Sequence, residues 1–302
     1  MLEPTHAHRS LPAARLAALF AAPLVILGVA YGTPTALYYS AESVATTPPA
    51  AVEVDGRAIF AQNCAYCHGE RGDGNGPAHV DPRARYFGAE KYKFASTMNA
   101  MPTDADIASL LRRGIPGSAM PAFPKLSDAD VDAVIGHVRQ LTRRGREEEL
   151  VRKAERARQK TIDDGEDDKP PPVNVAKILA QVEDQLKLGA PLAMPAEFPP
   201  ATADVVARGR KTFLLACAGC HGPEGKGDGP QVNDAKFVND NGTRAKPRNL
   251  TEGVFKGGRE PQNIYARIML GIPGTPMPAS SATLKPGDVQ DLARYVLSLS
   301  VQ

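Results

Sequence analysis

Two stretches far apart in the chain carry apolar residues at the spacing of one helix face. The repeats of i, i+3, i+4 and i+7 fall at Val131, Val134, Ile135, Val138 and Leu141, and again at Val289, Leu292, Ala293, Val296 and Leu299. Asp128 and Pro286 mark the expected starts of these two helices. A shorter helical stretch precedes each of them, near residues 103–113 and 261–270, and no convincing strand alternation is visible. The pattern predicts an all-α protein in which one helical unit occurs twice.

An earlier helix in each unit is the expected packing partner of the closing helix. Gly56 and Phe60 are four residues apart in the first unit, and Gly209 and Phe213 repeat that spacing in the second. Residues four apart lie on the same helix face. We therefore expect these faces to pack against the apolar stripes of the closing helices.

The segment between the two units differs in composition. Residues 146–160 are rich in Arg and Glu, an acidic run follows at 163–168, and three prolines stand at 170–172. A second helix with a partly apolar face is expected over 175–188. The predicted organisation is therefore a unit at 50–145, a helical charged and proline-rich linker at 146–200, and a unit at 201–302. The linker could instead dock a partner subunit.

The first 49 residues are predicted to be a signal or membrane anchor with a short tether. Arg15 and Glu42 enclose 26 uncharged residues, long enough to span a membrane. Arg9 and Arg15 place the N-terminus inside by the positive-inside rule. The pattern favours a retained N-terminal hydrophobic helix over a cleaved signal peptide. In either case, the two units are expected on the periplasmic side of a bacterial membrane.

Composition argues against some functions, and the cysteines carry the clearest chemical signal in the sequence. The 302 residues include 36 Lys and Arg against 34 Asp and Glu, a balance that argues against nucleic-acid binding as the main function. All four cysteines lie in two copies of one pattern, Cys64-Ala-Tyr-Cys67-His68 and Cys217-Ala-Gly-Cys220-His221. This CxxCH pattern is the attachment signature of c-type haem. Two thiols bond the haem vinyl groups, and the histidine that follows supplies a ligand to the iron.

A zinc site or a redox-active dithiol fits these cysteines less well than haem does. A zinc ribbon needs cysteine pairs about 15–20 residues apart, whereas 149 residues separate Cys67 from Cys217. A thioredoxin-like pair needs a βαβ context that the pattern does not show. Two covalently bound haem c groups, each with one iron, are therefore expected.

A methionine recurs in the same loop of both units. The loops read Gly114-Ile-Pro-Gly-Ser-Ala-Met120-Pro121 and Gly271-Ile-Pro-Gly-Thr-Pro-Met277-Pro278. A methionine that only filled the core would have no reason to recur there, and a thioether can be the second axial ligand of cytochrome c iron. The candidate iron ligands are therefore His68 with Met120 and His221 with Met277. Pro82-Arg83 is matched with Pro247-Arg248 as a further element of the repeat.

Both units resemble class I cytochrome c domains on these motifs, over residues 52–143 and 203–301. The resemblance implies low-spin haem, one-electron transport and no catalytic residues. Such a di-haem cytochrome would have redox protein partners in a respiratory chain, as a subunit of, or a donor or acceptor to, a quinol-oxidising complex or a haem–copper oxidase. The alternative is a di-haem peroxidase, which would need one haem that can open. Two features depart from the pattern of that family: the sequence Pro82-Arg-Ala-Arg-Tyr-Phe87 and the linker helices.

Positive charge is concentrated in the second unit. Residues 201–302 hold 13 Lys and Arg against 9 Asp and Glu. We expect the excess around the second haem, at Lys226, Lys236, Arg244, Lys246, Arg248, Lys256 and Arg259. Surface charges of this kind can steer an acidic partner; alternatively, they are scattered charges that only keep the chain soluble.

Overall fold

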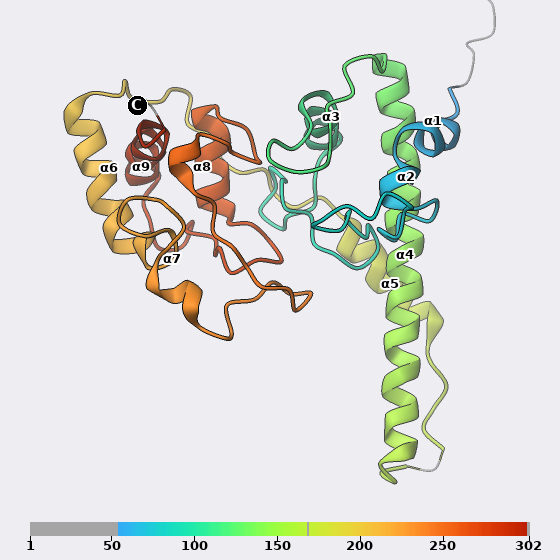
Figure 1. Cartoon of the computed structure of the whole chain (residues 1–302). Coiled ribbons are helices and arrows are strands. Elements are labelled where there is room, and N and C mark those ends of the chain that lie inside the picture. Colours follow the sequence, from blue (N-terminus) through green and yellow to red (C-terminus); the bar gives the residue numbers. More distant parts are fainter. Residues whose placement is uncertain (1–53, 168, 301–302) are drawn as a thin grey trace, which may run out of the picture. The chain divides into compact units, whose positions relative to one another are not determined.

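The computed structural model describes residues 54–167 and 169–300, and this part of the chain is helical (Figure 1). Residues Val52–Gln302 form one compact unit. Over the described residues the structure has no β-strand, and two isolated β-bridges are its only β pairing. The predicted all-α fold is therefore confirmed. The predicted N-terminal hydrophobic helix lies outside the described residues, and no helix among those described combines the length and apolarity needed to cross a bilayer.

The helices form the same series in each half of the chain. The first domain contains α1 (Gly56–Asn63), α2 (Ala65–His68), α3 (Asp104–Arg113) and α4 (Asp128–Asp163). The second contains α6 (Ala203–Ala216), α7 (Ala218–His221), α8 (Pro261–Leu270) and α9 (Pro286–Ser298), with 3₁₀ turns at Pro230–Asn233 and Leu250–Glu252. Helix α5 (Val175–Leu186) lies between them in sequence. We call these halves domain 1 and domain 2.

Glycines allow the predicted helix crossings. A Cβ on Gly56 would overlap the backbone carbonyl of Ala133 in α4, and a Cβ on Gly209 would overlap that of Asp291 in α9. Only glycine lets the two backbones come this close. The expected packing of α1 on α4 and of α6 on α9 is confirmed.

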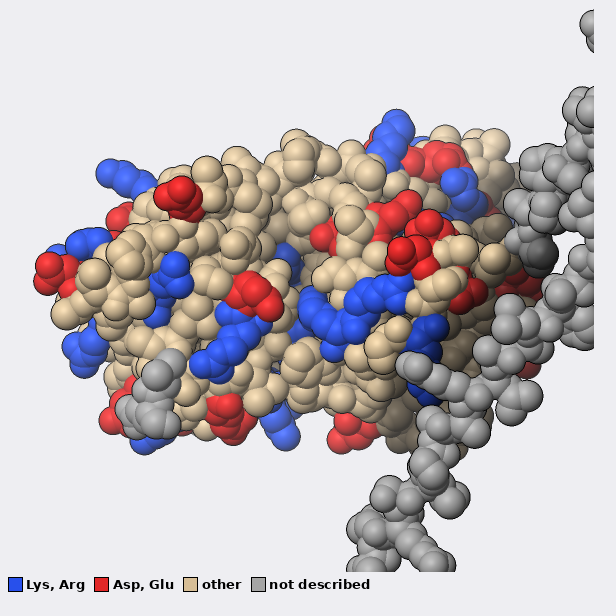
Figure 2. Space-filling view, turned by 90° about the horizontal axis from the view of Figure 1, so that it is seen from above, with Lys and Arg blue, Asp and Glu red and all other residues tan. Residues whose placement is uncertain are grey.

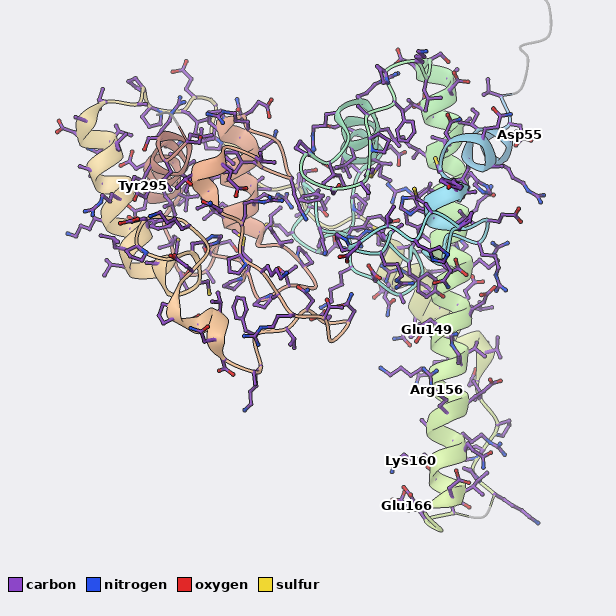
Figure 3. The ribbon with its side chains drawn as sticks, in the orientation of Figure 1. Asp55, Glu149, Arg156, Lys160, Glu166 and Tyr295 are labelled. Atoms are coloured by element: carbon purple, nitrogen blue, oxygen red, sulfur yellow. The ribbon has the colours of Figure 1, made fainter. Side chains whose placement is uncertain are left out.

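Equivalent rings stand beside each crossing. Phe60 packs against His137 with ring centroids 5.2 Å apart, and Phe213 packs against Tyr295, labelled in Figure 3, at the same 5.2 Å. His137 therefore occupies the packing position that Tyr295 fills in domain 2. The cores around them are separate apolar clusters, one from α1, α3 and α4 and one from α6, α8 and α9.

Helix α4 is longer than the sequence pattern predicts, because it runs without a break through residue 145. Its first half is buried as far as Thr142 and Gly145, and its second half is solvated. In the second half Glu149 pairs with Arg152 and Arg156; Figure 3 shows Glu149, Arg156 and Lys160 in succession along the helix, with Glu166 beyond its end. Such pairs at helical spacing support an exposed helix. The predicted domain boundary thus falls inside one helix that belongs to both the domain and the linker.

The rest of the linker is attached to both domains. Helix α5 packs against α4, where Arg146 Nη1 donates to Gln185 Oε1 at 3.1 Å. The Leu192 amide then donates to the carbonyl of Ser96 in domain 1 at 2.8 Å, while the Leu192 side chain is buried in the core of domain 2. Arg294 of α9 donates to the carbonyl of Pro199 at 2.6 Å. The described residues 175–200 of the predicted linker therefore contact both domains.

Candidate haem sites

Each CxxCH motif forms a short helix directly after the first long helix of its domain. Cys64 and Cys217 end the preceding helices with nearly the same backbone angles, φ −122° and −120°. The next four residues form α2 and α7, so the two thiols and the imidazole of each motif lie within about one turn. This is the local geometry that the spacing predicts.

Each motif histidine is held by one backbone hydrogen bond. His68 Nδ1 lies 3.2 Å from the carbonyl oxygen of Arg85, and His221 Nδ1 lies 3.3 Å from that of Arg248. Since a carbonyl oxygen can only accept, the Nδ1–H donates. Burial is the main effect on both rings, and it lowers the pKa of His68 and of His221. The neutral ring then keeps a lone pair on Nε2, the state in which histidine binds a metal.

The four cysteines are free thiols and all are partly buried. Burial, with a smaller contribution from the neighbouring cysteine, raises the pKa of Cys64 and of Cys217 to about 11. These thiols are therefore protonated at neutral pH and unbridged. Two thiols within about one turn of an imidazole with a free Nε2 are the donor set that c-type haem requires, and the residues fit that cofactor.

The glycine-rich loop after each histidine folds back over the motif. The Gly74 amide donates to the carbonyl of His68 at 2.8 Å, and the Gly227 amide donates to that of His221 at 2.8 Å. Both glycines have φ in the left-handed region, 77° and 80°. These left-handed glycines thus allow the loop to turn back and pack closely on the CxxCH backbone.

The structure corrects the match between the two loops that follow. The carbonyl that holds the histidine belongs to Arg85 in domain 1 and to Arg248 in domain 2. Two positions later, the Phe87 amide donates to Gly72 at 2.9 Å and the Leu250 amide donates to Gly225 at 2.7 Å. Arg248 therefore corresponds to Arg85, two residues beyond Arg83. The shared Pro-Arg pair misled the sequence comparison because the proline stands three residues before Arg85 but directly before Arg248.

The aromatic neighbours of the histidines differ. The rings of His68 and Phe87 stack with centroids 4.8 Å apart and planes 18° apart. Domain 2 has Leu250 at that position, and His221 instead lies 6.4 Å from the ring of Phe213 in a tilted arrangement. The two imidazoles thus have the same backbone partner and different side-chain neighbours.

The two methionine loops have the same backbone. The Ile115 amide donates to the carbonyl of Met120, and the Ile272 amide donates to that of Met277, both at 3.1 Å. A hydroxyl closes each loop, from Ser118 onto the Ile115 carbonyl at 2.8 Å and from Thr275 onto the Ile272 carbonyl at 2.7 Å. Gly114 and Gly271 start the loops at φ 68° and 66°.

Some candidate site residues of each domain pack against its apolar cluster. Cys64 and Met120 both pack against the apolar cluster that contains Phe60 and Leu111. In domain 2, Cys217 packs against the equivalent cluster, while Met277 is half-buried. The remaining methionines beside these sites differ in burial, since Met101 and Met269 are core residues and Met98 is exposed.

Comparison with known proteins identifies the class. The family model described as "Cytochrome C oxidase, cbb3-type, subunit III" matches residues 51–138, and the model described as "Cytochrome c" matches residues 206–300. The chain is therefore a c-type cytochrome with two cytochrome c-type domains in tandem, and it carries two covalently bound haem groups with iron. The resemblance to cytochrome c domains and the expectation of two bound haem groups are both confirmed.

A solved structure matches over most of the chain. It is a chain of the reducing HAO-like protein complex from Kuenenia stuttgartiensis, 27% identical, with a TM-score of 0.62. The match covers 81% of this chain and 94% of that chain. Among curated proteins, none matches.

The basic residues of domain 2 do not all face solvent. Figure 2 shows Lys and Arg beside Asp and Glu over much of one face of the molecule. Lys226 pairs with Glu224, and Arg244 donates to the carbonyls of Val232 and Asp234. Arg248 and Lys256 are half-buried at the contact with domain 1 (below), whereas the other five predicted residues are exposed and can contribute to a free surface: Lys226, Lys236, Arg244, Lys246 and Arg259.

Proposed function

We propose that the protein carries single electrons through two haem sites, with His68 and Met120 as iron ligands in domain 1 and His221 and Met277 in domain 2. Cys64 and Cys67 bind the first haem covalently, and Cys217 and Cys220 bind the second. The observation that carries this proposal is the repeat of one backbone arrangement in both domains: a histidine fixed through Nδ1, and a methionine in a closed, glycine-started loop.

When bound, the haem iron supplies a reversible one-electron change. The chain's own residues then hold the iron and limit other reactions at it. The carbonyls of Arg85 and Arg248 fix the imidazoles, the methionine loops offer a second ligand, and the apolar clusters limit water. A thioether ligand favours the reduced iron relative to an imidazole, which raises the potential. With His68 and Met120 on one iron and His221 and Met277 on the other, neither site would leave a position for oxygen or peroxide.

We further propose that the protein works as a subunit of, or a donor or acceptor to, a larger membrane-associated redox complex on the periplasmic side. Support comes from the similar chain, which belongs to a reducing HAO-like protein complex, and from the long solvated half of α4. The haem-attachment motifs and the uncharged N-terminal stretch support an exported, anchored protein.

Peroxide turnover tests the carrier against the peroxidase alternative. The half-reduced, haem-loaded protein is mixed with hydrogen peroxide, and reoxidation is followed optically. We expect no turnover at an enzymatic rate, on the order of 10 per second, because both irons keep two protein ligands. Turnover at that rate, together with loss of one methionine ligand on half-reduction, would replace the carrier with the peroxidase.

A further inference from the structure

Reciprocal hydrogen bonds from arginines join the two domains within the compact unit. Arg267 of α8 donates through Nη1 to the carbonyl of Lys93 at 2.6 Å and through Nη2 to that of Ala95, with its guanidinium over the ring of Phe94. Arg113 of α3 donates in the other direction, to the carbonyl of Lys256 at 3.2 Å. Burial lowers the pKa of Arg267 to about 10. Charged donors on backbone carbonyls of the facing domain make this contact a specific one.

The methionine loop of domain 1 lies against domain 2 at Gly117. A Cβ placed on Gly117 would stand 3.0 Å from Arg248 Nη2 and 3.0 Å from Val254 Cγ1. Gly117 has φ 68° and no side chain, so the guanidinium packs directly on its backbone. At Gly274, the equivalent glycine of the Met277 loop, the nearest such atom is Lys91 Cβ at 4.0 Å.

Arg248 therefore takes part in both sites. Its backbone carbonyl accepts from His221 Nδ1 at 3.3 Å, and its guanidinium covers the loop that ends in Met120. Its counterpart Arg85 stays inside domain 1: the carbonyl holds His68, and the guanidinium donates to the Lys91 carbonyl and lies 5.2 Å from the centroid of the Tyr92 ring.

We propose that Arg248 is the positioning residue at which electrons cross between the domains, by way of the Met120 loop, the Arg248 side chain and the His221 imidazole. The proposal rests on the ligand assignment above. One electron leaves the reduced site and reduces the oxidised one; no bond forms or breaks and no proton moves. Covalent bonds link the two ligands except at two places: the van der Waals contact of Arg248 with Gly117, and the hydrogen bond between the Arg248 carbonyl and His221 Nδ1.

The position of Arg248 also has an electrostatic consequence. Its positive charge, 3.8 Å from the Glu252 carboxylate, lies beside the Met120 loop and in the loop that holds His221, so it favours the reduced state of both sites. The charge of Arg85 favours the reduced state of the first site alone. Removing the charge of Arg248 should therefore change the midpoint potentials of both sites, whereas removing the charge of Arg85 should change only that of the first.

The test compares Arg248→Gln with Arg85→Gln in the full, haem-loaded chain. Both substitutions keep the backbone carbonyl that holds the histidine. Midpoint potentials come from optical titration of the two haems, and the rate of electron exchange between them comes from photoreduction of one. We expect Arg248→Gln to lower both potentials and to slow the exchange by about tenfold, which corresponds to about 1.4 kcal/mol in activation free energy. Arg85→Gln should lower only the potential of the first.

Two further variants separate packing from charge and from misfolding. Val254→Ala opens the contact at Gly117 without removing a charge, and should slow the exchange with both potentials unchanged. Arg248→Lys keeps the charge and should restore most of both potentials. If Arg248→Gln lowers only the second potential and neither it nor Val254→Ala changes the exchange rate, Arg248 does not couple the sites. A wild-type protein that lacks two attached haems, or that lacks methionine ligation, would instead overturn the proposed function itself.

Discussion

The two domains share a backbone framework and differ in what their equivalent side chains contact. The carbonyl that orients the histidine, the glycine return over the motif and the closed methionine loop are the same in both. Phe87 stacks on His68, however, where domain 2 has Leu250, and Arg85 stays in its own domain where Arg248 reaches the other. The backbone therefore defines the haem site, while the side chains at matched positions decide how the site is joined to its surroundings.

The largest expected effect comes from the feature that the domains share most closely. Gly56→Ala and Gly209→Ala each place a methyl group on a backbone carbonyl of the facing helix. Neither carbonyl can move aside as a side chain would, so we expect each substitution to lower the free energy of unfolding by about 2–3 kcal/mol. Denaturant unfolding of the haem-loaded protein measures it.

Gly136→Ala is the control for these glycines. Gly136 lies inside α4, and an added Cβ would meet no atom within 4 Å. Alanine favours a helix over glycine, so this variant should gain about 0.5–1 kcal/mol. Destabilisation by Gly136→Ala, or tolerance of alanine at Gly56 and Gly209, would contradict the shared crossing geometry.

The contact between the domains should show the next effect. Arg267→Leu removes charged donors from the carbonyls of Lys93 and Ala95, and we expect a loss of about 2 kcal/mol. Lys91→Ala removes an ion pair with Asp240 that also joins the domains but is solvent-exposed on both sides, and it should cost less than about 0.5 kcal/mol. Equal losses of unfolding free energy from the two variants would show that Arg267 stabilises the domain contact no more than an exposed ion pair does.

A smaller effect should follow from exchanging the residues that differ beside the histidines. Phe87→Leu removes the stack on His68 and should cost about 1 kcal/mol. Leu250→Phe should also destabilise, because Leu250 is buried in the apolar cluster of domain 2 and a larger ring would overpack it. Thermal unfolding of each variant measures both. A stable protein with either exchange would mean that the two environments are interchangeable.

The sequence predicted most helix bounds because the caps are local. Helix α3 begins after Thr103, whose side chain forms a capping box with Asp106, and α8 begins with Pro261 at its first turn. The continuity of α4 could not be predicted in the same way. Gly145 interrupts the pattern, yet it stays helical because its open side packs on Gly88, from a loop distant in sequence.

The site was predictable as far as its motifs reach. Cys, His and Met carry the signature in the sequence itself, whereas the carbonyl partners Arg85 and Arg248 leave no residue-type signal, because any residue has a carbonyl. Only the hydrogen bonds of the folded loops reveal their equivalence. The contact of Arg248 with Gly117 joins positions more than a hundred residues apart and depends on how the two domains pack.

Optical spectra of Met120→Ala and Met277→Ala test the central claim, that both domains form the same His–Met site, most directly. Methionine bound to oxidised haem iron gives a weak band near the red end of the spectrum. We expect each variant to lose half of this band and to lower one midpoint potential while the other site is unchanged, and the double variant to lose the band entirely. A band that survives in the double variant would contradict the assignment of both methionines.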